Sequence, residues 1–318
     1  MKKFELWHGD CLELMKNIPD GSVDLVLTDP PYGTMKGAAL DGWKNQTTEW
    51  DTAIDPLNIF EQISRVLRPN GKAVLFSQEP YTSRLITSSI PSLPFAYRAM
   101  WYKNVHANAL LAKSAMVSRY EDICIFSCSK GGGEVAEYMK SELENSGLTV
   151  KKINEMLGTS TMASHYFRAG CQFVLPTKEK YEKLQTTGFW QRPYDELKEK
   201  TMPVFNLWQG GKSKSNVLEY KKDNDGYHPT QKPVALLEDL IQTYSNDGDT
   251  VLDFTAGSMS TVIACINTNR NCIAIEKDEH YFSVGCKRVH NHILDNNIDD
   301  GYFNIAKKRI EEAVNDLP

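Results

Sequence analysis

The sequence predicts an α/β protein built on a buried, mostly parallel sheet of seven strands. Three observations indicate this fold class. Short apolar runs rich in β-branched and aromatic residues recur along the chain, helical stretches lie between some of them, and turn residues such as Asn70-Gly71 and Asp247-Gly248 separate the elements. Runs that are apolar throughout are typical of strands covered on both faces. With 318 residues, 41% of them hydrophobic, the chain can bury one large core, alone or with a smaller lobe, without disulfides or metals.

The expected elements alternate along most of the chain. Strands are predicted at residues 4–8, 24–28, 72–77, 96–102, 122–127, 250–254 and 272–276. Helices are predicted at residues 10–17, 56–67, 80–88, 233–244 and 261–267, with a charged terminal helix at about 302–315. Pro56 and Pro233 suit the first turn of a helix, because proline has no N–H to donate and its fixed φ fits a helix start.

This alternation stops between Gly131 and about Gly226, where the chain becomes polar, lysine-rich and helical. We therefore expect a main domain of residues 1–133 and 223–318, interrupted by a mostly helical inserted module of residues 134–222. Within the module, helices are predicted at 134–145, at 150–157, and from the turn at 158–160 to about Arg168. Their spacing resembles a helix-turn-helix, whose second helix enters the major groove of DNA, and a plain three-helix lobe explains the pattern equally well.

Charge is distributed unevenly along the chain. There are 36 Lys and Arg residues against 41 Asp and Glu, a formal net charge of -5. Residues 151–222 hold 13 basic and 7 acidic residues, whereas the rest of the chain holds 23 and 34. Nucleic acids are polyanions held by Lys and Arg, so a basic segment in an acidic protein fits a local nucleic-acid footprint. A solvated, lysine-rich lobe fits the same distribution.

Composition disfavours several classes of protein. No run approaches the roughly 18 apolar residues of a membrane span, and the N-terminal residues lack the long apolar stretch of a signal peptide. The seven cysteines are scattered, without a C-x-x-C pair of the kind that zinc sites use. We therefore expect a cytoplasmic protein with reduced thiols, no metal and no membrane contact.

The tetrapeptide Asp29-Pro30-Pro31-Tyr32 directly follows the predicted strand at 24–28. It therefore lies at a carboxyl end of the sheet, where open α/β folds bind ligands. Two successive prolines lock φ at about −65° and disfavour helix at the residue before each of them, so the peptide leaves the strand as a stiff, extended hook. A proline-rich turn, with Asp29 as a local hydrogen-bond acceptor, is the alternative interpretation.

Such a hook suits the chemistry of an exocyclic amino group on adenine or cytosine. The lone pair of that nitrogen is delocalised into the ring, so the group must be activated before it can attack an electrophile. Asp29 can accept a hydrogen bond from one N–H, and a carbonyl of Pro30 or Pro31 can accept the other, which localises the lone pair. Tyr32 can stack on a base extruded from the duplex, an interaction worth about 1–3 kcal/mol in single-strand binders.

A second set of residues lies far downstream. The segment from Asp253 to Ser260 is predicted to run from a strand through a turn of small residues into a helix, and such a turn lets backbone N–H groups approach a ligand. The strand at 272–276 ends in Glu276, where nucleotide-binding sheets place an acid against a ribose diol. A strand-to-helix turn that serves packing alone is the alternative.

Together these motifs resemble the DNA amino-methyltransferases, specifically the permuted beta group, in which the catalytic tetrapeptide precedes the cofactor loop. Three further segments match the family: His8-Gly9-Asp10-Cys11, His228-Pro229-Thr230-Gln231-Lys232-Pro233, and Arg119-Tyr120-Glu121-Asp122 together with Trp101-Tyr102-Lys103. The resemblance covers nearly the whole chain outside the inserted module. It implies a Rossmann-like, S-adenosylmethionine-dependent methyltransferase sheet, with the inserted module recognising the target DNA.

The resemblance also implies roles for individual residues. The tetrapeptide residues Asp29, Pro30, Pro31 and Tyr32 would be catalytic. Asp253 and Gly257 would border the methionine portion of the cofactor, and Glu276 its ribose hydroxyls. Asp10 would meet the cofactor adenine, while Thr230 and Lys232 would help to close the site. The full cofactor-binding set would be Asp10, Cys11, Thr230, Lys232, Asp253, Phe254, Thr255, Ala256, Gly257, Ser258, Glu276 and Lys277.

The implied reaction is methyl transfer from S-adenosylmethionine to the exocyclic N6 of a flipped-out adenine in double-stranded DNA. The family tends to pair an initial Asp with adenine N6 and an initial Ser with cytosine N4, so Asp29 favours adenine and leaves cytosine open. A glycine usually stands at the position of Met259, and a catalytically impaired DNA-binding protein of this fold is a second alternative. A methyltransferase for RNA or for a protein side-chain amide is a third, because an amide nitrogen poses the same delocalisation problem.

DNA contacts are expected mainly from the inserted module. The candidate residues are Lys103 beside the base pocket and, in the module, Lys151, Lys152, Ser160, His165, Arg168 and Arg192. Phosphate contacts supply affinity without sequence information, so a basic module fits a defined short site and broad adenine modification equally. A restriction endonuclease partner and a homodimer are both open.

Overall fold

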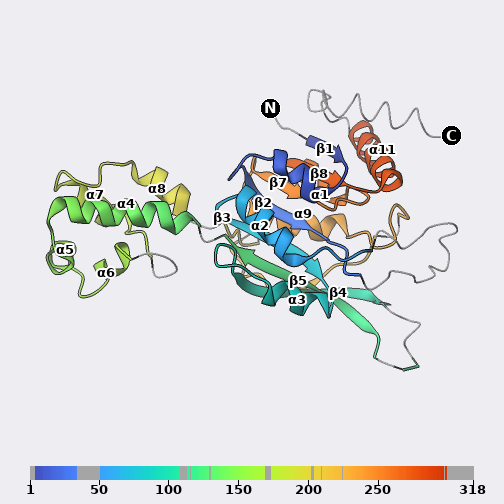
Figure 1. Ribbon diagram of the computed structural model, residues 1–318, viewed down its shortest axis with the longest axis horizontal. Coiled ribbons are helices and arrows are strands. Elements are labelled where there is room, and N and C mark those ends of the chain that lie inside the picture. The colour runs from blue at the N-terminus through green and yellow to red at the C-terminus, as the bar shows by residue number, and fades with distance from the viewer. Residues whose placement is uncertain are drawn as a thin grey trace. The chain divides into compact units, whose positions relative to one another are not determined.

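The computed structural model divides the chain into two compact units (Figure 1). It describes residues 4–33, 51–107, 113–114, 116–128, 130–168, 173–201, 204–208, 210–223, 225–296 and 298. The larger unit comprises residues 1–67, 71–127 and 204–318, and the smaller unit comprises residues 68–70 and 128–203. The helix expected at about 302–315 lies outside the described residues.

The larger unit is built on one mixed sheet, in the strand order β1-β8-β7-β2-β3-β5-β4-β6. The strands are β1 (Phe4–His8), β2 (Val23–Thr28), β3 (Leu67–Ser77), β4 (Phe95–Ala107), β5 (Ser118–Ser127), β6 (Val217–Glu219), β7 (Thr250–Asp253) and β8 (Asn271–Glu276). The pairings from β1 to β3 are parallel, β5 runs antiparallel to β3 and β4, and β6 is parallel to β4. All seven expected strands are present. The short strand β6 was not expected, and with it the sheet has eight strands among the described residues.

Helices cover both faces of this sheet (Figure 1). They are α1 (Cys11–Leu14) with the 3₁₀ turn Met15–Asn17, α2 (Pro56–Val66), α3 (Tyr81–Thr87), α9 (Val234–Tyr244), α10 (Ser260–Asn267) and α11 (Glu279–Asp295). Pro56 is the first residue of α2, as predicted, whereas Pro233 lies one residue earlier than expected and is the N-cap of α9. Helix α11 was not predicted, although its buried residues Phe282, Cys286, Val289 and Ile293 repeat at helical spacing.

Alternation along the strands separates two apolar layers. Leu25 and Leu27 of β2 belong to a core that also contains apolar side chains of α9, α10 and α11. On α2, Phe60 packs against Phe126 of β5, with ring centroids 4.8 Å apart. Residues 23–27 of β2 include four with no exposed surface, because a central strand is covered on both faces.

Strand direction brings one set of ends to a single edge of the sheet. Strands β1, β8, β7, β2 and β3 are parallel, so their carboxyl ends share that edge. Strand β5 runs the opposite way, and its amino end reaches the same edge, where Asp122 pairs with Ser77. The chain order jumps from β7 to β2 between neighbouring strands, and such switch points in open α/β sheets form ligand crevices.

The smaller unit is helical and has its own core. Its helices are α4 (Lys130–Ser146), α5 (Val150–Leu157), α6 (Ala163–Tyr166), α7 (Lys178–Gln185) and α8 (Tyr194–Thr201). The core includes Met139, Ile153, Tyr166, Tyr181 and Trp190. Helix α6 has four residues and ends before Arg168, so the second helix of the expected helix-turn-helix is a single turn. The structure favours the interpretation as a plain helical lobe.

The boundary of the inserted module also differs from the expectation of 134–222. Residues 204–222 belong to the larger unit, where β6 pairs with β4 and Tyr220 donates its hydroxyl to Asp239 of α9. Composition placed them in the module because they are lysine-rich. Their partners are distant in sequence, and pairing with β4 decides where they fold.

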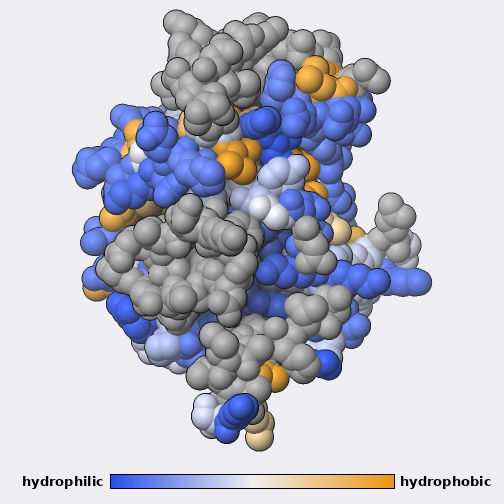
Figure 2. Space-filling model, turned by 90° about the vertical axis from the view of Figure 1, so that its right-hand side faces the viewer, coloured by the Kyte–Doolittle hydropathy of each residue, from blue (hydrophilic) through white to orange (hydrophobic). Residues whose placement is uncertain are grey.

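Among the residues coloured by hydropathy in Figure 2, hydrophilic ones predominate and apolar ones stand in small groups. Within the described part of the chain, no helix combines the length and apolar character needed to cross a membrane.

Candidate active site

A cavity of about 920 Å³ lies in the larger unit at the shared strand edge. Its lining includes the whole tetrapeptide Asp29-Pro30-Pro31-Tyr32, Lys103, and all twelve residues of the expected cofactor-binding set. The structure therefore brings together segments that lie more than 200 positions apart in sequence. The other expected DNA-binding residues belong to the smaller unit: Lys151, Lys152, Ser160, His165, Arg168 and Arg192.

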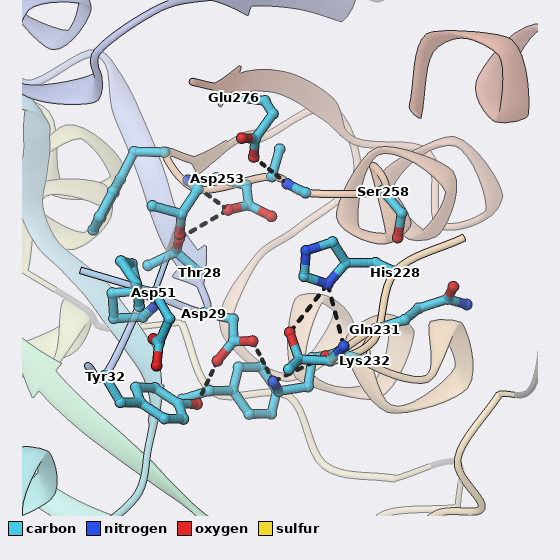
Figure 3. A pocket seen from close by; sticks show the side chains of 18 of the residues that line it. Thr28, Asp29, Tyr32, Asp51, His228, Gln231, Lys232, Asp253, Ser258 and Glu276 are labelled. Atoms are coloured by element: carbon cyan, nitrogen blue, oxygen red, sulfur yellow. Dashed lines mark hydrogen bonds and ion pairs between the residues drawn. The ribbon is translucent and has the colours of Figure 1, made fainter. Parts of the chain in front are cut away.

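Asp29 is held on both carboxylate oxygens by neighbouring side chains (Figure 3). The Tyr32 hydroxyl donates a hydrogen bond to Oδ1, and the Lys232 ammonium donates to Oδ2. Burial raises the pKa of Asp29 above its usual range, although the Lys232 charge opposes the shift. Because β2 ends at Thr28 and two prolines follow, the hook has the rigidity expected for a fixed acceptor.

Lys232 belongs to a larger arrangement, here called the four-charge cluster: Lys103, Glu121, Lys232 and Asp29. Glu121 accepts a hydrogen bond from Lys103 through Oε1, and its Oε2 lies 3.2 Å from Lys232 Nζ. The side chains of Lys232 and Glu121 are 6% and 10% exposed. Burial works to raise the pKa of Glu121, but the charges of Lys232 and Lys103 outweigh it and lower that pKa. Buried charges persist when they are paired in this way.

Across the cavity, Asp253 is fixed by hydroxyl groups. Thr28 donates to its Oδ1 at 2.8 Å, and Thr261 donates to its Oδ2 at 2.6 Å. Burial raises the pKa of Asp253 to about 6, although these hydrogen bonds oppose the shift. Thr28 immediately precedes the tetrapeptide, so a single residue connects the expected cofactor side of the cavity to the expected base side.

The turn after β7 is shaped by Glu276. The Gly257 N–H donates to Glu276 Oε2 at 2.7 Å, and the Asp278 N–H donates to Oε1 at 2.7 Å. Gly257 has φ of +51°, in the left-handed region that favours glycine. Arg288, which is buried, donates to the Ser258 carbonyl at 3.1 Å and to Ser260 Oγ at 2.7 Å. The turn is therefore fixed from two sides before a ligand enters.

Met259 is the N-cap of α10 and has φ of +60°, the conformation for which a glycine is the usual choice. Its side chain is fully buried, and Gly285 of α11 provides the space. A Cβ at Gly285 would lie 2.4 Å from Met259 Cγ. The turn therefore keeps its left-handed residue with a methionine in place of glycine, because a glycine on the facing helix accommodates the larger side chain.

We predict that Gly285→Ala lowers the free energy of unfolding by about 1–3 kcal/mol, the usual cost of overpacking a core. The sign is informative, because the same change inside an unobstructed helix stabilises by up to about 1 kcal/mol. In a Met259→Gly background the same Gly285→Ala change should cost much less, because the side chain that it overlaps is gone. Chemical denaturation of the single and double variants measures both effects, and a stabilised Gly285→Ala would refute the packing explanation.

His228 covers the turn from the opposite wall. Its ring lies 3.8 Å from the position that a Cβ on Gly257 would occupy, and its centroid is 4.1 Å from that of Tyr281. Burial, followed by the charges of Lys232 and Lys222, lowers the pKa of His228 to about 3. The Thr230 N–H donates to Nδ1 at 3.2 Å, so the neutral ring is an acceptor at Nδ1 and a donor at Nε2.

Asp10 caps α1 by accepting a hydrogen bond from the Leu12 N–H at 3.0 Å. Its second oxygen lies 3.0 Å from Lys277 Nζ. Burial works to raise the pKa of Asp10, but Lys277 and the backbone N–H groups outweigh it and lower the pKa. Asp10 and Lys277 thus form one rim of the cavity, between β1 and β8.

Some lining residues were not singled out from the sequence. Phe76 lies with its ring centroid 5.1 Å from Lys232 Nζ, and Asp51 accepts a hydrogen bond from the Gly33 N–H at 3.0 Å. Lys222 and Tyr281 also line the cavity. None of them stands in a recognisable motif. The sequence offered one indication, for Phe76: it lies in a predicted strand that ends at the edge of the sheet where the site was expected.

Lys232 is placed differently from the expectation. The resemblance put it with the cofactor-binding residues, whereas its contacts are with Asp29 and Glu121 on the opposite side of the cavity from Glu276 (Figure 3). Thr230 meets His228 instead, which itself lies against the cofactor turn.

The chain belongs to the N6/N4 DNA methylase family, whose model matches residues 23–287. That stretch contains the tetrapeptide, the turn after β7 and the end of β8.

Two relatives and a solved structure are similar to the chain. The DNA adenine methyltransferase YhdJ of Escherichia coli (strain K12) is 27% identical over 285 residues, covering 89% of this chain and 81% of YhdJ. The type II methyltransferase M.HindIII of Haemophilus influenzae is 32% identical over 321 residues, covering 89% of this chain and 94% of M.HindIII. The crystal structure of the M1.HpyAVI–SAM complex has a TM-score of 0.53 at 19% identity, covers 90% of this chain and 98% of that chain, and has the same fold.

Proposed function

We propose that this DNA methylase transfers a methyl group from S-adenosylmethionine to the exocyclic N6 of an adenine extruded from double-stranded DNA. The observation that carries the proposal is the cavity itself, which is lined both by Asp29 of the rigid hook and by the Asp253–Gly257 turn with Glu276. Its volume of about 920 Å³ is at the upper end of the range for ligand pockets and suits a base beside a nucleoside cofactor. The name of the relative YhdJ, a DNA adenine methyltransferase, supports adenine.

The donor and acceptor groups on the cofactor side suit S-adenosylmethionine. Glu276 has its carboxylate fixed by two backbone N–H groups, and its remaining lone pairs can accept from ribose hydroxyls. Asp253 offers a buried carboxylate for the ammonium of the methionine portion. When bound, S-adenosylmethionine supplies an electrophilic methyl group on a positively charged sulfur.

On the base side, Asp29 accepts a hydrogen bond from one N–H of the amino group, and a carbonyl of the Pro30-Pro31 segment accepts the other. These acceptors hold the nitrogen lone pair toward the methyl group. S-adenosylmethionine, held by Asp253 and Glu276, would supply the methyl group, with its sulfur as the leaving group that keeps the electron pair of the broken carbon–sulfur bond. The amino nitrogen would lose one proton to solvent water. Tyr32 supports the base by stacking and orients Asp29 through its hydroxyl.

Cofactor affinity should depend on pH through Asp253. Ionised Asp253 attracts the ammonium group, so affinity for S-adenosylmethionine should be full well above pH 6 and fall as the pH drops through about 6. Calorimetric titrations between about pH 5 and 8 measure this, with Asp253→Asn as the control that lacks the titrating carboxyl. A dissociation constant that stays flat across that range in the unchanged protein would contradict the assignment.

The effect of Asp253 on stability has the opposite sign. Its folded pKa lies above the usual value of 3.8, so the protonated form is favoured in the fold. Its contribution to the free energy of unfolding therefore rises as the pH falls from about 6 toward 3.8.

The smaller unit is proposed to bind DNA and recognise the target. Lys151 and Lys152 are exposed at the start of α5, whereas Arg192 pairs with Glu196 and lies over the Tyr138 ring, 5.1 Å from its centroid. We predict that Lys151→Gln with Lys152→Gln weakens DNA binding at all sequences and reduces the salt slope of log affinity by about 1.8 if both side chains contact phosphates. Lys16→Gln, in an exposed pair with Glu13 on the larger unit, is the matched control. An unchanged salt slope would show that neither Lys151 nor Lys152 contacts phosphates of the DNA.

Transfer of labelled methyl groups to DNA, RNA and protein in parallel tests the proposed function. Label should enter DNA. Label in RNA or protein alone would replace DNA as the substrate, and binding of DNA without any transfer would identify an impaired enzyme. Cytosine N4 is the second candidate target, because the family includes both N6 and N4 enzymes. A restriction endonuclease partner stays a prediction, supported by the name type II methyltransferase of M.HindIII, and so does a homodimer.

A further inference from the structure

The Asp29 carboxylate already accepts hydrogen bonds from two side chains. Asp29 contacts Tyr32 through one oxygen and Lys232 through the other (Figure 3). An amino group that is to donate to Asp29 must share or replace one of these donors. The Tyr32 hydroxyl belongs to the same rigid hook and moves with Asp29, whereas Lys232 comes from the segment before α9. Lys232 is therefore the donor that can be exchanged.

Lys232 has a second carboxylate within reach. Glu121 Oε2 lies 3.2 Å from Lys232 Nζ, while Glu121 Oε1 already accepts from Lys103. The Phe76 ring lies beneath the ammonium, with its centroid 5.1 Å from Nζ. A small displacement away from Asp29 toward Glu121 would keep the buried cation paired throughout, so the exchange avoids the cost of an isolated charge.

The charges of the four-charge cluster are balanced. The four-charge cluster contains two cations and two anions, and the further groups that face it are Tyr32, Tyr81, Lys222, His228 and Asp253. Burial, and then the charges of Lys103 and Lys232, lower the pKa of Lys222, and His228 is neutral. Lys232 is thus the cation that opposes the burial-driven rise in the pKa of Asp29.

We propose that Lys232 is a positioning residue for the methylation reaction, which holds Asp29 ionised and aimed in the empty site and shifts to Glu121 when the target amino group arrives. Glu121 is then the residue that receives Lys232, and Lys103 fixes Glu121 in place. This inference rests on the proposed function, because it assumes that Asp29 accepts a hydrogen bond from the base.

The two partners of Lys232 predict opposite changes in a pH profile. In Lys232→Met, Asp29 loses its compensating cation, so its pKa rises. The acid limb of kcat/KM for DNA, which reports the protein before the base binds, should move to higher pH by at least about one unit, with partial recovery of activity at alkaline pH. In Glu121→Gln, the nearby negative charge is lost and Lys232 stays with Asp29. The acid limb should then move to lower pH, and KM for DNA should rise by about tenfold or more, since one charged hydrogen bond is at stake.

The profiles are measured as transfer of labelled methyl groups to genomic DNA at saturating S-adenosylmethionine, so that protonation of Asp253 does not enter. Lys214→Met is the matched control, because Lys214 has a side chain only 8% exposed, is paired with Asp239 at 2.5 Å and does not line the cavity. It should lose a comparable amount of stability and keep the unchanged acid limb. Lys232→Arg should restore the limb, because it restores the cation.

Loss of activity in folded Lys232→Met at every pH, with no shift of the limb, would overturn the inference. So would shifts of the same sign in Lys232→Met and Glu121→Gln. If Lys232→Met does not fold, the acid shift in Glu121→Gln and the rescue in Lys232→Arg decide the matter by themselves. Failure of the proposed function is distinguishable, because it would appear as absent methyl transfer in the unchanged protein or as full activity in Asp29→Asn.

Discussion

Replacing Asp29 with asparagine is expected to lower kcat for DNA methylation by roughly 10²–10³, the usual cost of removing one preorganised electrostatic group from an active site. The asparagine has nearly the same shape and keeps one acceptor oxygen, but it lacks the negative charge that makes the amino group more nucleophilic. It also leaves Lys232 with Glu121 as its one remaining carboxylate partner among those the structure describes. Single-turnover transfer of labelled methyl groups measures the chemical step separately from product release.

The effect should be confined to the base side of the cavity. Binding of S-adenosylmethionine to Asp29→Asn is expected to stay within about twofold of the unchanged protein, because Asp253 and Glu276 are untouched. Asp20→Asn is the matched control, since Asp20 is 78% exposed, pairs with Arg65 and does not line the cavity. Normal kcat in a folded Asp29→Asn would show that Asp29 is not the acceptor for the target amino group.

The second large effect concerns the cofactor side. In Glu276→Ala, affinity for S-adenosylmethionine should fall by about 10- to 150-fold, equivalent to one charged hydrogen bond of about 1.5–3 kcal/mol. Two causes act together, because the substitution removes the proposed ribose acceptor and frees the Gly257 N–H that Glu276 fixes. Equilibrium binding of the cofactor by calorimetry measures the change.

Glu279→Ala provides the comparison for this loss. Glu279 is an exposed glutamate three residues further along the chain, in the first turn of α11, and it does not line the cavity. Its loss should leave cofactor affinity unchanged. Equal affinities in the two variants would show that Glu276 has no part in binding.

The parts of the fold that the sequence predicts well are those with local signals. Strands β2 and β8 each contain a short apolar run, at residues 25–27 and 272–275, and acids or prolines mark their ends. Strand β6 has three residues in an exposed, buried, exposed pattern, and it exists because β4 offers it a parallel partner more than 100 positions away. Such pairing leaves no local mark, which is why residues 204–222 were assigned to the inserted module.

The same division applies to the site. The tetrapeptide and the turn after β7 were predictable because each is a contiguous motif at a strand end. The contact between Lys232 and Asp29 spans 203 positions, and the fit of Met259 against Gly285 depends on the packing of α10 against α11. In both cases the contact forms between residues that are distant in sequence, so tertiary packing determines it and no local pattern predicts it.

The identity of the methylated base tests the proposed function most directly. DNA free of modified bases is incubated with the protein and S-adenosylmethionine, digested to nucleosides, and analysed by liquid chromatography and mass spectrometry. N6-methyladenine should appear with the unchanged protein and be reduced roughly 10²- to 10³-fold in rate with Asp29→Asn. N4-methylcytosine in place of N6-methyladenine, or no methylated nucleoside at all, would contradict the proposed methylation of adenine N6.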